Sequence, residues 1–168
     1  MIGNAEQLSF ARGSFDCVTC LGSLENFIDP EQALQEIHRV LKDGGIFCTM
    51  MPQKYWLGDI LKVAFGRDEE VPFQHIDRTA TLHQWRRLLE CHGFAVKRIY
   101  GYVKTSPLIK QGKIRSMRKF IWTHLLALIC PTSLAWSLVF ICEKSLAVQQ
   151  GYRAGPPWAW RAEWIGSQ

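Results

Sequence analysis

The chain has 168 residues, of which 48% are hydrophobic and 21% are charged. This length allows one domain with a real core, and these proportions exclude a disordered or fibrous protein. The formal net charge is +5, and basic residues gather between positions 104 and 119 with no acidic residue among them. Such a patch can attract phosphate, nucleic acid or anionic lipid, but we expect a solvated face and no nucleic-acid partner.

Six cysteines are scattered among apolar neighbours, which favours reduced, buried thiols over a disulfide framework. Because the chain also lacks an N-terminal signal pattern, we expect a cytoplasmic protein. Cys17 and Cys20 form a CxxC pair, but positions three apart on a strand face opposite sides, so core packing is favoured over a shared metal. Cys91 and His92 are assigned to a helix end, since no second pair lies at metal spacing. No metal site is predicted.

The first part of the chain has the pattern of a strand, a helix and a second strand. Residues 15–22 are an apolar run that predicts a buried strand. A helix begins after Asp29, the predicted N-cap, with Pro30 at its first position, and is expected to end at Gly44. Residues 46–51 form the second apolar run. The short links favour parallel strands with a right-handed crossover.

The next part begins with a long connection. Residues 52–79 are mixed in character and predict a loop with a helix at 55–65. Thr81 begins a capping-box pattern, and the helix that follows is expected to end at Gly93. Residues 94–103 predict a strand.

The last part predicts a helix at residues 120–130 and an apolar strand at 134–142. A strand that is apolar on both faces is typical of the middle of a covered sheet. We therefore expect one domain over residues 1–148, with a basic and apolar helical insertion at 106–133. A tail containing Trp, Pro and Gly follows at residues 149–168.

Four segments of the sequence form a set of motifs whose order and spacing can be compared with those of known families. They are residues 3–10 (GNAEQLSF), 13–16 (GSFD), 29–30 (DP) and 36–45 (EIHRVLKDGG). Together they resemble the later motifs of class I S-adenosylmethionine-dependent methyltransferases of the ubiquinone-biosynthesis and sterol-methyltransferase type. The resemblance is close over residues 3–52 and looser over residues 79–104 and 134–144.

This resemblance implies an α/β fold with part of a Rossmann-like methyltransferase sheet. Residues 15–22 would be the fourth strand, 46–51 the fifth and 94–103 the sixth. Residues 134–142 would be an antiparallel seventh strand inserted between the last two. The implied reaction is methyl transfer from S-adenosylmethionine to an unidentified acceptor, a small molecule or a lipid.

The resemblance also implies two groups of cofactor-binding residues. In such enzymes an acidic or amide side chain after the third strand hydrogen-bonds the adenine amino group, and an Asn oxygen can accept in this way. The end of the fourth strand borders the methionine part of the cofactor, at the carboxyl ends of the strands. The first group is Asn4, Ala5 and Glu6, and the second is Cys20, Leu21 and Gly22.

Two residues are candidate catalytic bases near the transferred methyl group. His75 lies where related enzymes present a lid or a general base, and its near-neutral pKa suits removal of a proton from oxygen or nitrogen. The alternative is a solvated loop histidine. Glu25 follows the predicted fourth strand and could serve in its place.

One family feature does not occur in this sequence. There is no G-x-G-x-x-G loop, which the family places after its first strand, so we expect Met1 to be an internal or truncated start. The strand at residues 15–22 would then expose an unpaired edge. The alternative to an enzyme is therefore a non-catalytic, truncated methyltransferase-like module that binds a partner through this edge and the basic stretch.

The segment that runs from Lys110 to Cys130 has the pattern of a basic-flanked interfacial helix. Its apolar part, residues 120–130, is too short to span a bilayer, which takes about 20 residues. We expect contact with a membrane surface, or a cap over the substrate, and a lipid-like substrate would suit either. The sequence predicts no oligomeric state.

Overall fold

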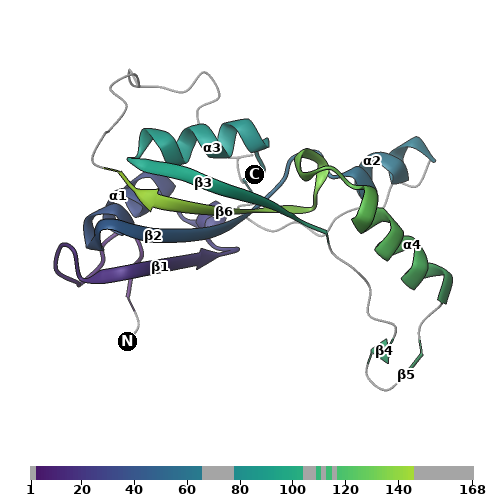
Figure 1. Cartoon of the computed structure of the whole chain (residues 1–168), viewed down its shortest axis with the longest axis horizontal. Coiled ribbons are helices and arrows are strands. Elements are labelled where there is room, and N and C mark those ends of the chain that lie inside the picture. The colour runs from purple at the N-terminus through teal and green to yellow at the C-terminus, as the bar shows by residue number, and fades with distance from the viewer. Residues whose placement is uncertain (1–2, 66–77, 104–108, 111–112, 115–116, 146–168) are drawn as a thin grey trace, which may run out of the picture.

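A four-stranded sheet organises the computed structural model, which describes residues 3–65, 78–103, 109–110, 113–114 and 117–145 (Figure 1). Its strands are β1 (Phe15–Leu21), β2 (Leu41–Pro52), β3 (Phe94–Tyr102) and β6 (Ser137–Lys144). Their order is β1-β2-β6-β3, with β1 parallel to β2 and β6 antiparallel to both of its neighbours. The prediction of a late antiparallel strand inserted between two earlier strands is confirmed.

Helix α1 (Pro30–Val40) begins as predicted. The side chain of Asp29 accepts a hydrogen bond from the Gln32 backbone N–H at 2.9 Å, which satisfies one of the free amides of the first turn. The predicted end at Gly44 is wrong, because Leu41 already has extended backbone angles and pairs with Phe15 of β1. Gly44 does have a left-handed φ of 73°, but it lies within β2, where the pairing with β1 is irregular.

Helix α3 (Leu82–Cys91) carries both hydrogen bonds of the predicted capping box, between Thr81 and Gln84. Gly93 follows the helix with a φ of 82° and leads into β3, as predicted. Helix α2 (Leu57–Ala64) falls within the predicted range. The remaining elements are η1 (Leu24–Asn26), β4 (Ile109–Lys110), β5 (Lys113–Ile114), α4 (Met117–Ile129) and η2 (Thr132–Leu134). The paired strands β4 and β5 were not predicted, and α4 begins three residues early.

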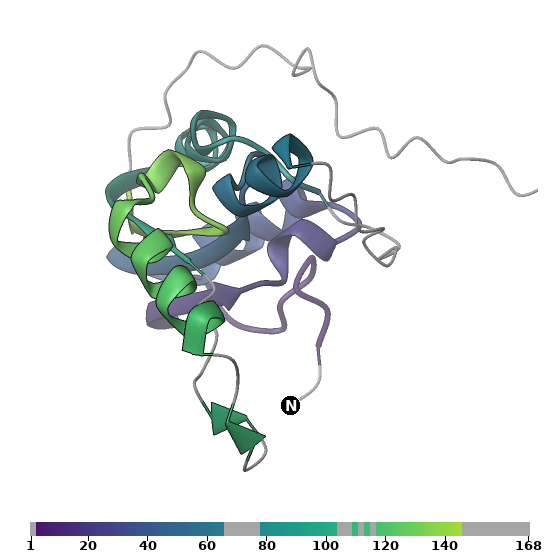
Figure 2. The same ribbon diagram turned by 90° about the vertical axis from the view of Figure 1, so that its right-hand side faces the viewer.

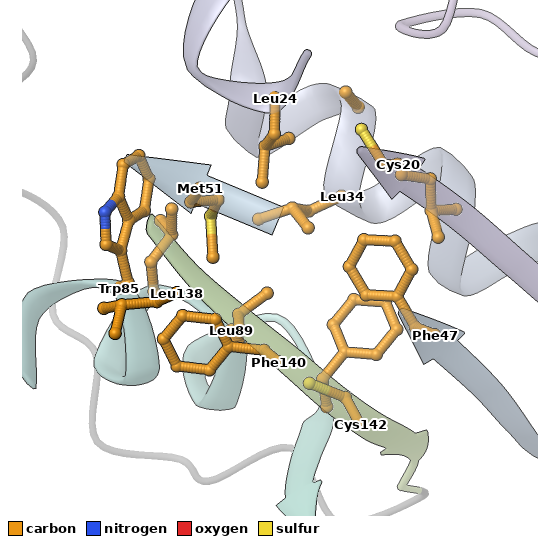
Figure 3. Packing of buried hydrophobic residues seen from close by; sticks show 14 of the residues in the cluster. Cys20, Leu24, Leu34, Phe47, Met51, Trp85, Leu89, Leu138, Phe140 and Cys142 are labelled. Atoms are coloured by element: carbon orange, nitrogen blue, oxygen red, sulfur yellow. The ribbon is translucent and has the colours of Figure 1, made fainter. Parts of the chain in front are cut away.

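The hydrophobic core lies on one face of the sheet, under α1 and α3 (Figure 2). Leu34 from α1 and Trp85 and Leu89 from α3 pack over Phe47 and Phe140 of the central strands (Figure 3). Because side chains alternate along a strand, the other face carries a second set of residues. These are partly or well exposed, and include Ile46, Met50, Val139, Ile141 and Tyr100.

The expectation of a sheet covered on both faces is therefore wrong for the described residues. Strand β6 does lie between two others, but the helices of the described residues cover one side of it. The burial predicted for β1 is also wrong, since Cys20 is the one buried residue of this strand. The physical reason is that β1 is an edge strand, as the sequence also predicted, with β2 as its partner among the described residues.

Cys17 and Cys20 illustrate the alternation within β1. Cys17 is exposed and Cys20 is buried, so the two thiols face opposite sides as predicted, although Cys17 does not pack in the core. Cys91 ends α3 and His92 is its C-cap, which confirms the predicted helix end.

The predicted tail at residues 149–168 lies outside the described residues, and the division of the chain at residue 148 stays a prediction. Within the part of the chain that is described, no helix is both long enough and apolar enough to cross a membrane.

Candidate functional site

The chain turns sharply where β1 ends. Gly22 has a φ of 64°, a conformation that glycine adopts without the strain of a side chain. Its N–H donates to the Met50 carbonyl of β2 at 3.0 Å, so the turn stays attached to the sheet. Cys20 is buried below this turn, whereas Leu21 and Gly22 are exposed at the carboxyl edge. Parallel strands commonly bind ligands at this edge.

Glu25 lies in the short helix η1, directly after the turn. Its side chain is buried, with the residue only 7% exposed, and it reaches back over the strand end. A Cβ atom added to Gly22 would lie 3.9 Å from Oε1 of Glu25. Burial, with a smaller contribution from the Glu25 charge, raises the pKa of the Cys20 thiol to about 11. The thiol is therefore neutral at physiological pH and is not a nucleophile.

Arg78 holds the loop that carries Glu25. Its guanidinium donates to the carbonyls of Glu25 at 3.3 Å and Ile28 at 3.1 Å, and also to the carbonyl of Phe27. Burial lowers the pKa of Arg78, and the nearby charges of Asp29 and Glu6 act in the opposite direction. These hydrogen bonds from Arg78 to three carbonyls fix the path of the loop between β1 and α1. No pattern in the sequence marks Arg78, because it belongs to the long loop before α3.

The predicted adenine-binding residues form a tight turn. Oδ1 of Asn4 accepts from the Glu6 N–H at 3.0 Å, and the Gln7 N–H donates to the Asn4 carbonyl at 3.1 Å. The carboxylate of Glu6 then accepts from the Asp29 N–H at 3.0 Å. The turn is thereby joined to the N-terminus of α1. Since Asp29 and Glu6 also act on Arg78, which holds the Glu25 loop, this turn lies near the loop that follows β1.

An ion pair within α1 anchors the segment that follows this turn. Nε of Arg39 lies 2.8 Å from Oε1 of Glu36. Oε2 of Glu36 accepts from the Leu8 N–H at 2.8 Å, and Arg39 donates to the carbonyls of Leu8 at 2.8 Å and Phe10 at 2.7 Å. The hydrogen bond with Arg39 is the main cause that lowers the pKa of Glu36 to about 2. Both residues belong to the motif segment at residues 36–45, but the motif does not predict this anchoring role.

The chemistry of this edge is that of a hydrogen-bond acceptor with one buried carboxylate. The oxygen of Asn4 can accept a second hydrogen bond because a carbonyl oxygen has two lone pairs. The donors of Arg78 are directed at backbone carbonyls, so they do not form a phosphate site. The described residues hold no group of three or more His, Cys, Asp or Glu that could bind a metal ion. A cationic ligand with amino groups fits these residues. His75 lies outside the described residues.

The sequence matches one protein family and also matches individual methyltransferases. Residues 1–49 match the family described as a methyltransferase domain. The chain is 27% identical to 2-methyl-6-phytyl-1,4-hydroquinone methyltransferase 2, chloroplastic, of Oryza sativa subsp. japonica, over 90% of this chain and 50% of that protein. It is 52% identical over 42 residues to the ubiquinone/menaquinone biosynthesis C-methyltransferase UbiE of Klebsiella pneumoniae, which covers 25% of this chain and 17% of that protein.

The fold also has solved neighbours. A SAM-dependent methyltransferase of Thermotoga maritima superimposes with a TM-score of 0.59 at 19% identity, over 85% of this chain and 62% of that structure. At this identity the likeness concerns the fold. The chain spans about half the length of the rice relatives it matches.

Proposed function

We propose that this chain, which belongs to the class I S-adenosylmethionine-dependent methyltransferases, takes part in methyl transfer from S-adenosylmethionine to a lipid-like hydroquinone. The observation that carries the proposal is the buried carboxylate of Glu25 at the carboxyl end of β1, directly over Gly22. The region matched to the methyltransferase family contains both residues.

The cofactor, when bound, supplies an activated methyl group on a positively charged sulfur. The adenine amino group would donate to Oδ1 of Asn4, with Ala5 and Glu6 completing the turn on which that oxygen is presented. Cys20, Leu21 and Gly22 would border the methionine end, where Gly22 has no side chain to block the approach. The carboxylate of Glu25 has the charge that stabilises a cation in a partly buried site. Arg78 would act as a positioning residue, because it fixes the Glu25 loop.

The names of the relatives support the class of acceptor. One is named for a hydroquinone with a phytyl tail and another for ubiquinone and menaquinone biosynthesis, so we propose an aromatic ring with an isoprenoid tail. Methylation of such a ring releases a proton. Glu25 would accept it, with His75 as the second candidate. Contact with a membrane surface through the segment that runs from Lys110 to Cys130 belongs to the same proposal. The alternative of a non-catalytic module is not favoured by the comparisons.

Calorimetric titration with S-adenosylmethionine and S-adenosylhomocysteine tests the role of Glu25. The two ligands differ in the methyl group and its positive charge, so a carboxylate near the sulfur affects them unequally. We expect Glu25→Gln to weaken binding of S-adenosylmethionine about tenfold, which corresponds to about 1.4 kcal/mol, and to change binding of S-adenosylhomocysteine much less. Glu143→Gln is the matched control, since Glu143 pairs with Lys97 on β3, and it should change neither affinity.

Two outcomes would contradict the proposal. If the wild-type chain gives a folded circular dichroism spectrum but binds neither ligand, these residues do not form a cofactor site. If Glu25→Gln weakens both ligands equally, the Glu25 charge does not act on the sulfonium.

A further inference from the structure

Helix α4 presents an apolar face to solvent. Met117, Ile121, Leu125 and Leu128 are all exposed, and their spacing of four, four and three residues places them on one side of a helix. Leu128 is 84% exposed, and Ile129 beside it is also exposed. A row of this kind is unusual on a surface that faces only water.

Helix α2 carries a second set of exposed apolar residues at the same end of the molecule. Ile60 and Leu61 are exposed within the helix, and Phe65 follows its last residue with 78% exposure. Both views show α2 and α4 beyond the carboxyl ends of β1 and β2 (Figures 1 and 2). This is the edge at which Glu25 and Gly22 lie. Exposed apolar side chains therefore lie at the same end of the molecule as the candidate site.

The sequence around α4 has one sign of charge. No Asp or Glu occurs between Glu90 and Glu143. Six basic residues lie between positions 104 and 119 of this interval: Lys104, Lys110, Lys113, Arg115, Arg118 and Lys119. A second copy of the chain would bring an equally basic segment against this one, which disfavours self-association. An anionic surface complements it.

We infer that the exposed faces of α2 and α4 form one docking surface for an anionic lipid bilayer. The apolar side chains would enter the boundary between headgroups and acyl chains, and the positive charge of the sequence around α4 favours anionic lipid. Docking at this end places the carboxyl edge of the sheet next to the membrane, where an isoprenoid acceptor dissolves. The inference rests on the proposed function for the identity of that acceptor.

Vesicle flotation with the full chain tests this surface. The vesicles are phosphatidylcholine alone or phosphatidylcholine mixed with phosphatidylglycerol, and the variants are Leu128→Gln on α4 and Ile46→Gln on the open face of the sheet. Both variants replace one exposed apolar side chain with an uncharged polar one. We expect the wild-type chain to bind the mixed vesicles preferentially and to be released by salt. Leu128→Gln should lower the partition coefficient about tenfold, and Ile46→Gln less than about twofold.

The result that would overturn the inference is equal binding to both vesicle types, no binding to either, or equal effects of the two variants. Calorimetry with S-adenosylhomocysteine, carried out without lipid, separates this outcome from failure of the proposed function. If cofactor binding is intact and flotation fails, the membrane contact is wrong and the proposed role in cofactor binding stands. If flotation succeeds and cofactor binding fails, only the proposed function is wrong.

Discussion

Glu36 and Arg39 direct their charges at the backbone of a neighbouring loop as well as at each other. Glu36 accepts a hydrogen bond from the Leu8 N–H, and Arg39 donates to the carbonyls of Leu8 and Phe10. The pair therefore holds this loop against α1. Arg78 acts in the same way on three carbonyls after β1. At the scale of the residue, the candidate site depends on long side chains that hold loops in place.

The lowered pKa of Glu36 makes a prediction about acid stability. A carboxyl group whose pKa falls from 4.5 to about 2 on folding contributes its full stabilisation above pH 4.5 and loses it as the pH falls toward 2. We expect the free energy of unfolding of the wild-type chain to decrease across this window. Glu36→Gln should be less stable at neutral pH, by about 1–2 kcal/mol, and should decrease less on acidification. Urea denaturation at a series of pH values measures both, and parallel profiles for the two chains would refute the prediction.

At the scale of the element, most boundaries follow from local signals. The caps at Asp29 and Thr81 begin α1 and α3 as expected. In each cap a side-chain oxygen accepts a hydrogen bond from a backbone N–H three residues later, so a short stretch of sequence is enough to predict it. The end of α1 was wrong because Leu41 pairs with Phe15 of a different element. Gly93 has a local role and a long-range role. Its φ of 82° ends α3, and its carbonyl accepts from the Ser145 N–H after β6 at 2.8 Å.

Replacement of Gly93 by Ala should cost more than replacement of Gly44. Both glycines have positive φ, but a Cβ on Gly93 would lie 2.7 Å from Nε2 of His38, whereas a Cβ on Gly44 meets nothing within 4 Å. The His38 ring also packs against Phe94, so it cannot move freely. We expect a loss of about 1 kcal/mol for Gly44→Ala, from backbone strain alone, and about 2–3 kcal/mol for Gly93→Ala. Urea denaturation compares them, and equal losses would mean that the His38 ring yields.

At the scale of the whole molecule, the sheet is unequal from edge to centre. Strand β6 pairs on both sides and carries the fully buried Phe140 and Leu138, whereas β1 pairs with β2 and has one buried residue. The two halves of the described chain are joined through β6, since β2 precedes α3 and β3 follows it. Stability should therefore be greatest along β2 and β6.

Hydrogen exchange followed by mass spectrometry tests this gradient. We expect amides of β6 and of residues 46–51 in β2 to exchange slowest, because opening them breaks the core, and amides of β1 to exchange at least about tenfold faster. Peptides from α3 provide an internal reference on the covered face. Protection of β1 equal to that of β6 would show that the edge position does not control local stability.

The sequence by itself determined the order of the four strands of the main sheet and of the helices between them, the caps, the class of fold and the inserted antiparallel strand. These features depend on patterns within a few residues or on a series of motifs that resembles one family. Only the tertiary structure decided that helices cover one face of the described sheet, that Cys17 is exposed and that Arg78 holds the Glu25 loop. Arg78 and Phe27 are 51 positions apart, and no local pattern encodes a contact of that separation. Such contacts form only when packing brings distant segments together, because their stabilisation depends on burial and geometry that residue order does not specify.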